Sequence, residues 1–229
     1  METATTDYIA LADQIANSSA VESLSPPIRV ALFLGAFALL STALVSVTAF
    51  TRIVIVLSFV RRALTTQEIP PTSVVIGLSF FLTLFVMAPT LDEIVNESIT
   101  PYVNEEKSMG DALRDGGIPL RKFMVSQTRE EDLGLMMTVA KLEAPTSMDV
   151  PVRVLIPAFI ISELKTAFIM GFCIYIPFLL IDLVVSTVLM SLGMMMMPPV
   201  MISLPFKILL FVLVDGWQLV IRAISSSFL

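Results

Sequence analysis

Two aspartates in the apolar last third of the chain, Asp182 and Asp215, are the only pair of side chains that could support catalysis, as an intramembrane aspartyl protease does. Asp215 lacks the Gly-x-Gly-Asp context of such enzymes. The chain has no histidine and a single cysteine, Cys173, which excludes a Ser-His-Asp triad, an HExxH zinc site, an internal disulfide and a CxxC redox motif. We therefore predict no enzymatic activity, no metal site and no cofactor.

The composition predicts a membrane protein. Of 229 residues, 56% are hydrophobic and 15% are charged, and the mean hydropathy is +0.89. A soluble domain carries about 25% charged residues, because its surface faces water. The net charge of −6 argues against a nucleic-acid partner, since no basic excess is available to neutralise phosphates.

The elements that position the charges are predicted from the order of apolar and polar segments. Two uncharged runs, 30–51 and 69–91, are long enough for a helix to cross about 30 Å of hydrocarbon. Prolines at positions 157, 177, 198, 199 and 205 predict that the later apolar segments are broken rather than straight. The predicted fold is an all-α membrane protein with broken helical hairpins. Its parts are an acidic N-terminal tail (1–29), two apolar helices joined by a short cytoplasmic turn (30–91), a helical periplasmic domain (92–153), and a broken apolar hairpin with a methionine-rich loop and a C-terminal helix (154–229).

The orientation is predicted from the basic residues. Arg61 and Arg62 lie in a short loop with a net positive charge, and such loops stay in the cytoplasm. The doubled proline at 70–71 ends this loop as a turn. The tail and the acidic 92–153 segment then lie outside, in the periplasm of a Gram-negative cell. The tail has acidic residues and no base before position 29, so it does not read as a secretory signal peptide.

Charged side chains inside apolar segments need a partner, water or a function, because burying them costs several kcal/mol. The groups concerned are Arg52, Glu163, Lys165, Asp182, Lys207, Asp215 and Arg222. Glu163 and Lys165 are two residues apart and do not face each other on a helix, so they do not simply neutralise one another. Lys207 is a plausible partner for Glu163, within the chain or between copies, and Lys207 and Asp215 share roughly one helix face. Charges at helix ends that reach the interface are the alternative.

Four consecutive methionines, Met194 to Met197, follow Gly193 and precede two prolines. They cannot all share one helix face, so we expect a loop that presents flexible apolar side chains. A plain hydrophobic turn in lipid, or a contact between subunits, is the alternative.

Several motifs in order over residues 42–222 resemble the FliP family of type III secretion export-gate proteins. The motifs are Thr48-Ala49-Phe50-Thr51-Arg52, Gln127-Thr128-Arg129-Glu130-Glu131-Asp132-Leu133, Ser162-Glu163-Leu164-Lys165, Leu192-Gly193-Met194-Met195-Met196, Leu204-Pro205-Phe206-Lys207 and Asp215-Gly216-Trp217. The Phe-Thr-Arg start and the ending Val214-Asp215-Gly216-Trp217 are more similar to the flagellar than to the virulence branch.

The resemblance implies a core subunit of the flagellar export gate in the bacterial inner membrane and the flagellar basal body. Its partners would be FliQ-like and FliR-like subunits, FlhA-like and FlhB-like export components, membrane lipid, unfolded flagellar substrates and further copies of the chain, as a pentamer. It further implies that Glu163 and Lys207 pair between neighbouring subunits, that Met194, Met195 and Met196 form a gasket at the pore constriction, and that Phe123 belongs to the domain involved in assembly. An equivalent virulence-system subunit and an ion- or solute-coupled transporter remain alternatives, although no internal repeat typical of transporters is found.

Overall fold

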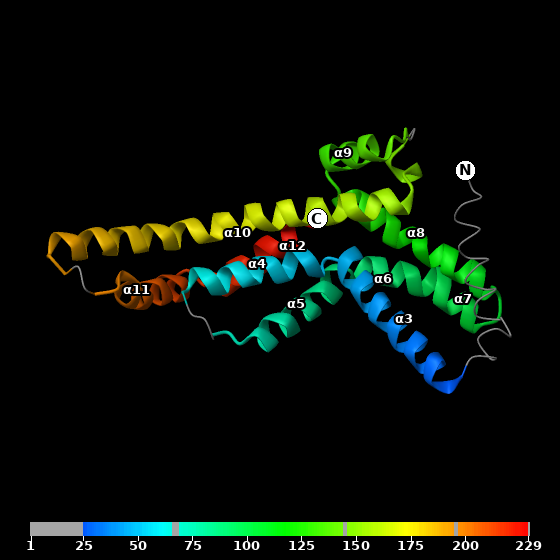
Figure 1. Cartoon of the computed structure of the whole chain (residues 1–229), viewed down its shortest axis with the longest axis horizontal. Coiled ribbons are helices and arrows are strands. Elements are labelled where there is room, and N and C mark those ends of the chain that lie inside the picture. The colour runs from blue at the N-terminus through cyan, green and yellow to red at the C-terminus, as the bar shows by residue number, and fades with distance from the viewer. Residues whose placement is uncertain (1–24, 66–68, 144–145, 195–196, 229) are drawn as a thin grey trace. The chain divides into compact units, whose positions relative to one another are not determined.

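A computed structural model of the chain describes residues 25–65, 69–143, 146–194 and 197–228, and every regular element in these ranges is a helix (Figure 1). The prediction of an all-α protein is therefore confirmed for the described residues. The contacts divide the chain into two compact units. The first unit comprises Met1–Val47 and Ala88–Ser126, and the second comprises Thr48–Met87 and Gln127–Leu229. The periplasmic location and the limits of the 92–153 domain stay predictions.

The first unit contains α3 (Pro26–Val47), α6 (Ala88–Ile94), a π-helical turn (Val95–Ile99), α7 (Thr100–Val103) and α8 (Met109–Gln127). Pro101 has no N–H, so the carbonyl of Glu97, four residues earlier, lacks its usual helical donor. The ammonium of Lys107 donates to that carbonyl at 2.8 Å and to Asp115 Oδ2 at 2.5 Å. Lys107 thus satisfies the backbone group that Pro101 leaves open and ties it to α8.

The second unit is built on one very long helix. Its helices are α4 (Phe50–Ala63), α5 (Thr72–Val86), α9 (Glu130–Ala140), a 3₁₀ turn (Ser147–Asp149), α10 (Val152–Ser191), α11 (Pro199–Leu213) and α12 (Gly216–Ser226). α10 packs against α4, α9 and α11, and Figure 1 shows α4 and α11 running alongside it. Residues Ile53, Val56, Leu57 and Val60 of α4 recur at helical spacing and are at most 1% exposed. They and the facing side of α10 form the core of this unit.

The uncharged run 30–51, expected as one helix, is interrupted. α3 ends at Val47 and α4 begins at Phe50, whose backbone N–H donates to Thr48 Oγ1 at 3.4 Å. Thr48 thus contacts the first residue of the new helix, whereas the N-cap residue is Ala49, and no side chain among the described residues caps this helix. The described part of residues 30–86 therefore contains three helices, α3, α4 and α5, and the middle one carries Arg52, Arg61 and Arg62.

The run 69–91 also ends earlier than expected. α5 stops at Val86, because Pro89 has no N–H and its ring clashes with the carbonyl of Phe85, four residues before it. The predicted turn at Pro70–Pro71 is confirmed in its described part, since α5 begins directly after it at Thr72.

The expectation that prolines break the third apolar segment is wrong. α10 continues through Pro157 and Pro177 for 40 residues. Each proline removes only one N–H, whereas leaving the helix in apolar surroundings would expose several backbone groups without partners. The last segment is broken as expected, although at Val214–Asp215 and not at Pro205: α11 and α12 meet at 64°. Lys207 and Asp215 consequently do not share a helix face.

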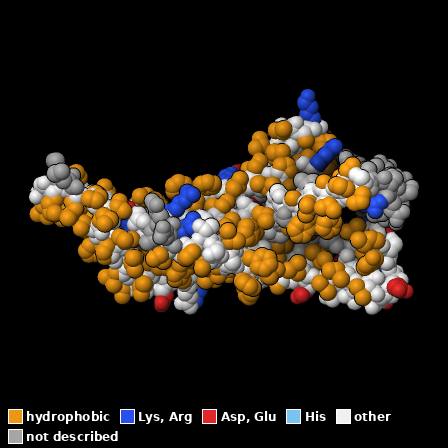
Figure 2. Space-filling view, turned by 60° about the horizontal axis from the view of Figure 1, so that its bottom comes forward, with side chains coloured by type: hydrophobic (Ala, Val, Ile, Leu, Met, Phe, Trp, Pro, Cys, Tyr) orange, Lys and Arg blue, Asp and Glu red, His pale blue; other side chains and the backbone are white. Residues whose placement is uncertain are grey.

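Large hydrophobic side chains cover much of the face seen in Figure 2. The exposed hydrophobic side chains of α10 and α11 include Phe168, Phe172, Leu183, Met201 and Phe206, each at least 48% exposed. By length and apolar composition, α10 is the one described helix able to cross a membrane alone, and up to three spans result if each of two bent helix pairs is one span.

Candidate functional site

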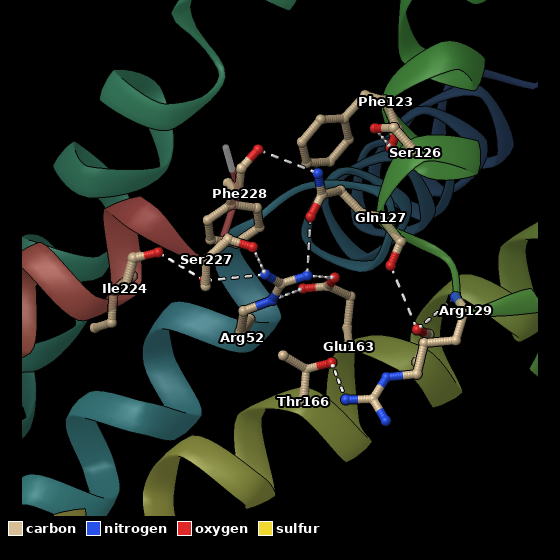
Figure 3. A network of polar contacts seen from close by, with 11 residues as sticks. Arg52, Phe123, Ser126, Gln127, Arg129, Glu163, Thr166, Ile224, Ser227 and Phe228 are labelled. Atoms are coloured by element: carbon tan, nitrogen blue, oxygen red, sulfur yellow. Dashed lines mark hydrogen bonds and ion pairs between the residues drawn. The ribbon is translucent and has the colours of Figure 1, made fainter.

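The candidate site is a network of buried polar groups around Arg52, a residue in the first turn of α4 (Figure 3). The Arg52 side chain is 2% exposed and faces Glu163 on α10, which is 0% exposed. Arg52 Nε donates to Glu163 Oε2 at 2.9 Å, and Arg52 Nη2 donates to Glu163 Oε1. The two parallel bonds form the bidentate arrangement that makes an arginine–carboxylate pair strong and geometrically specific.

The remaining donors of Arg52 bind two other segments of the second unit. Nη1 donates to the backbone oxygen of Ser227 at 2.8 Å and to its hydroxyl at 3.0 Å, and Nη2 donates to Gln127 Oε1 at 3.2 Å. The ring of Phe228 lies 3.9 Å from the guanidinium carbon, a cation–π contact. Figure 3 shows these bonds converging on one guanidinium, whose five N–H donors are all used.

Gln127 connects this network to the start of α9. Its Nε2 donates to the backbone oxygen of Phe228 at 3.3 Å, and its backbone carbonyl oxygen accepts from Ser162 Oγ at 3.3 Å. The Ser162 hydroxyl in turn accepts from the Arg129 backbone N–H at 3.0 Å. Residues 162 and 163 of α10 thus hold both α4 and the connection between α8 and α9 (Figure 3).

A second buried pair joins α10 to α11. Lys207 Nζ, on a side chain that is 1% exposed, donates to Asp182 Oδ2 at 2.6 Å. Ser203 Oγ, one helical turn before Lys207, donates to Asp182 Oδ1 at 2.6 Å. Lys207 also lies 3.5 Å from Thr65 Oγ1, beyond the end of α4. Asp182, itself 26% exposed, therefore accepts a hydrogen bond from each of the two polar side chains that α11 presents to α10.

The structure does not bring Glu163 and Lys207 together within one chain, because Glu163 binds Arg52 and Lys207 binds Asp182. Their pairing between copies stays a prediction. The other charged residues singled out in the sequence are more exposed. Lys165 contacts Glu131 at 3.3 Å on the surface, and Asp215 is exposed at the break between α11 and α12, with a left-handed backbone (φ 50°).

The methionine loop is described in part. Met194 is 42% exposed and follows Gly193, whose φ of 73° reverses the chain after α10. Met195 and Met196 lie outside the described residues. Phe123 is half-buried on α8, in the first unit.

The sequence interpretation missed the partners of the buried charges. It singled out Arg52 and Asp182 as buried polar groups without assigning either to a partner. The sequence contained one signal of these pairs. A buried charge must be neutralised nearby, and the bases Arg52 and Lys207 are matched by the acids Glu163 and Asp182. The polar run Ser225–Ser227 near the C-terminus was a second signal, since it is unusual in so apolar a segment.

Comparison with known proteins agrees with these motifs. A model of the FliP family matches residues 33–224. The chain belongs to the FliP family. It is 53% identical over 215 residues to the flagellar biosynthetic protein FliP of Bacillus subtilis (strain 168), covering 93% of this chain and 97% of that one.

Two further relatives of this FliP-family chain carry the same description. The flagellar biosynthetic protein FliP of Pectobacterium carotovorum is 50% identical over 208 residues, which is 90% of this chain and 81% of that one. The FliP of Buchnera aphidicola subsp. Acyrthosiphon pisum is 49% identical over 208 residues, and the match spans 90% of this chain but 55% of that longer protein.

Proposed function

We propose that this FliP-family chain is a core subunit of a flagellar type III export gate in the bacterial inner membrane, through which unfolded flagellar proteins leave the cytoplasm. FliQ-like and FliR-like subunits complete the gate, FlhA-like and FlhB-like components act beside it, and several copies of the chain, expected to be five, line the pore. Family membership over residues 33–224, with relatives described as flagellar, is the observation that carries the proposal.

The distribution of apolar and charged groups supports a role as an assembled membrane subunit. The charged groups at 52, 163 and 207 are almost completely buried and paired inside the chain, whereas large apolar side chains remain exposed along α10 and α11. Exposed apolar faces of this extent mark contacts with lipid or with other subunits. The surface therefore has the composition of a protein that is covered by membrane and by partners.

The turn after α10 is the segment that we assign to the pore constriction. Met194 is exposed directly after the left-handed Gly193, at the end of the long apolar helix. A resting export pore must exclude ions and still admit an unfolded chain, and flexible apolar side chains meet both needs. We assign this sealing role to Met194, Met195 and Met196.

The proposed orientation places the segment 92–153 in the periplasm and the connection after Arg61 and Arg62 in the cytoplasm. In a Cys173→Ser background, single cysteines at Asp111 or Glu131 should react with an impermeant thiol reagent added from outside the inner membrane. A cysteine at Thr66, which lies outside the described residues, should not react until the membrane is opened. The reverse pattern would overturn the orientation.

Complementation and co-expression test the function itself. The chain should restore motility to a flagellated strain from which its own FliP-family gene is deleted, and should not restore secretion to a virulence-system mutant. Co-expressed with FliQ-like and FliR-like chains and extracted in mild detergent, it should run as one complex whose mass contains several copies. A chain that remains monomeric with both partners present, or that restores only virulence secretion, would contradict the proposal.

A further inference from the structure

Three helices of the second unit, α4, α5 and α12, meet around a small apolar pocket. The pocket has a volume of about 150 Å³ and is lined by Leu57 of α4, Pro70, Val74, Val75 and Leu78 in and before α5, and Trp217 of α12. Leu57 and Val75 are 1% and 4% exposed and form its floor, whereas Val74 and Trp217 are 53% and 39% exposed at its mouth. Every lining side chain is apolar, apart from the indole N–H of the tryptophan.

An arginine at the end of α4 is hydrogen-bonded to the first residue of α5, two positions before the pocket-lining Val74. Arg61 and Arg62 form the last turn of α4, and Arg61 is one helical turn after Leu57 on the same side of the helix. Arg61 Nη1 donates to the hydroxyl of Thr72, the first residue of α5, at 2.8 Å, which leaves that hydroxyl free to donate a hydrogen bond elsewhere. Arg62 is exposed, and among the described residues no ion pair or hydrogen bond of its side chain is seen. Among the residues that the structure describes, no acidic side chain forms an ion pair with Arg61 or Arg62.

No acidic side chain lines the pocket. Asp215, the acidic residue that precedes α12, lines a neighbouring pocket together with Phe211 and Gln218, and Trp217 lines both pockets. Arg61 and Thr72 thus offer a positive charge and a hydroxyl donor beside an apolar hollow, and Arg62 adds a second positive charge at the next position of α4. This combination is complementary to a molecule with an anionic head and a hydrocarbon tail.

We propose that this pocket binds an anionic phospholipid, with its phosphate at Arg61 and Thr72, where Arg62 adds to the positive potential, and with part of an acyl chain between Leu57, Val75 and Trp217. Guanidinium groups bind phosphate through two hydrogen bonds at once. An apolar cavity of about 150 Å³ holds a hydrocarbon the size of benzene, which corresponds to a section of an acyl chain and not to the whole. Tryptophan and arginine at the ends of apolar helices are typical of the level of lipid headgroups. The inference rests on the chain being a membrane protein and does not depend on its role in export.

The single tryptophan of the chain makes the site directly observable. Trp217 is the only tryptophan among the 229 residues, so the fluorescence comes from this one side chain, which lines this pocket and the neighbouring one. The purified full-length chain is placed in nanodiscs of phosphatidylcholine and phosphatidylglycerol, with bromine on the acyl chains of one lipid at a time. Brominated phosphatidylglycerol should quench Trp217 at a mole fraction about fivefold lower than brominated phosphatidylcholine, because only the former brings a net negative charge to the arginines.

The variants separate headgroup recognition from ordinary solvation by lipid. Arg61→Gln with Arg62→Gln should make the two quenching curves coincide without weakening quenching by brominated phosphatidylcholine. Arg222→Gln, which removes an exposed arginine elsewhere on α12, should leave the difference between lipids intact. Equal quenching by both lipids in the wild type, or an unchanged difference in the double variant, would overturn the proposal.

Competition on the wild type gives a result even if the double variant does not fold. Unlabelled phosphatidylglycerol should relieve quenching by its brominated form, whereas the same mole fraction of phosphatidylcholine should not. Inorganic phosphate should also fail to relieve it, because the acyl chain contributes to binding. Relief by phosphatidylcholine would show that no headgroup is selected, and relief by phosphate would show an anion site without a lipid.

Discussion

Arg52 and Glu163 lie 111 residues apart in the chain and form a bidentate ion pair with 2% and 0% of their side chains exposed. No other pair described in this chain is buried on both sides to that degree. Because Arg52 also binds Ser227 and Gln127, one guanidinium joins α4 to α10, to the C-terminal residues and to the connection before α9.

Removing one member of this pair should be far more harmful than removing both. Arg52→Gln or Glu163→Gln leaves an unpaired charge in the interior, typically at a cost of about 3–5 kcal/mol, whereas the neutral double variant leaves none. We expect each single variant to lower the melting temperature of the detergent-extracted chain and the double variant to recover part of the loss. Additive single effects would show that the two groups are not coupled.

Lys122→Gln is the matched control. Lys122 pairs with Glu93 at 2.9 Å on the surface, where both side chains are more than 40% exposed. The hydrogen bond to Glu93, with its charge, raises the pKa of Lys122 above the usual 10.5, so this pair is present at neutral pH and its contribution is lost only as the pH rises beyond that value. An exposed pair stabilises little, and the melting temperature of this variant should stay close to that of the wild type at pH 7.

The pairing of Lys207 can be decided by two double-mutant cycles. Within the chain Lys207 binds Asp182, so Lys207→Gln and Asp182→Asn should be coupled in the stability of the unassembled chain. If copies also pair through Glu163 and Lys207, then Glu163→Gln and Lys207→Gln should be coupled in the yield of oligomer. A charge exchange is a poor test, because Glu163→Lys would place an ammonium against Arg52. If Glu163→Gln and Lys207→Gln change the yield of oligomer independently of each other, the pairing between subunits is refuted.

Gly171 of α10 is predicted to be irreplaceable for a steric reason. A Cβ built there would lie 2.5 Å from the ring of Phe59 on α4, which itself packs against Phe168 with ring centroids 5.5 Å apart. Gly171→Ala should therefore destabilise the chain by about 1–3 kcal/mol, measured by thermal unfolding in detergent. Gly77→Ala is the control, since nothing lies within 4 Å of its Cβ position and alanine favours a helix. Phe59→Leu should relieve part of the Gly171→Ala effect, and no relief would mean that another contact is responsible.

Replacing Met194, Met195 and Met196 by alanine should open a leak without preventing assembly. Alanine is too short to close a ring of side chains, so cells that overproduce the complex should become permeable to small solutes or lose membrane potential. Replacement by leucine should seal nearly as well but slow export, because branched side chains adapt less easily. An intact oligomer with three alanines and wild-type conductance would remove the gasket role.

The sequence predicted which residues form helices better than which charges pair. Uncharged runs and the doubled proline located the apolar segments and the turn before Thr72, because those signals are local. Arg52, Glu163, Asp182 and Lys207 allow two neutral pairing schemes, and only the packing of α4 and α11 on α10 selects between them. The continuity of α10 through Pro157 and Pro177 was missed for a similar reason, since neither proline outweighs the packing of the whole helix.

The length of α10 sets a geometric demand on any assembly. Forty residues rise about 60 Å along a helix axis, twice the roughly 30 Å thickness of a hydrocarbon core. Yet the exposed hydrophobic side chains run from Val152 at one end to Met190 at the other. If α10 crosses the bilayer without tilt, the hydrocarbon covers only about half of the helix. The exposed hydrophobic side chains on the other half must then be shielded by protein. α10 therefore requires contacts with other protein outside the membrane, whichever half of the helix lies in the lipid.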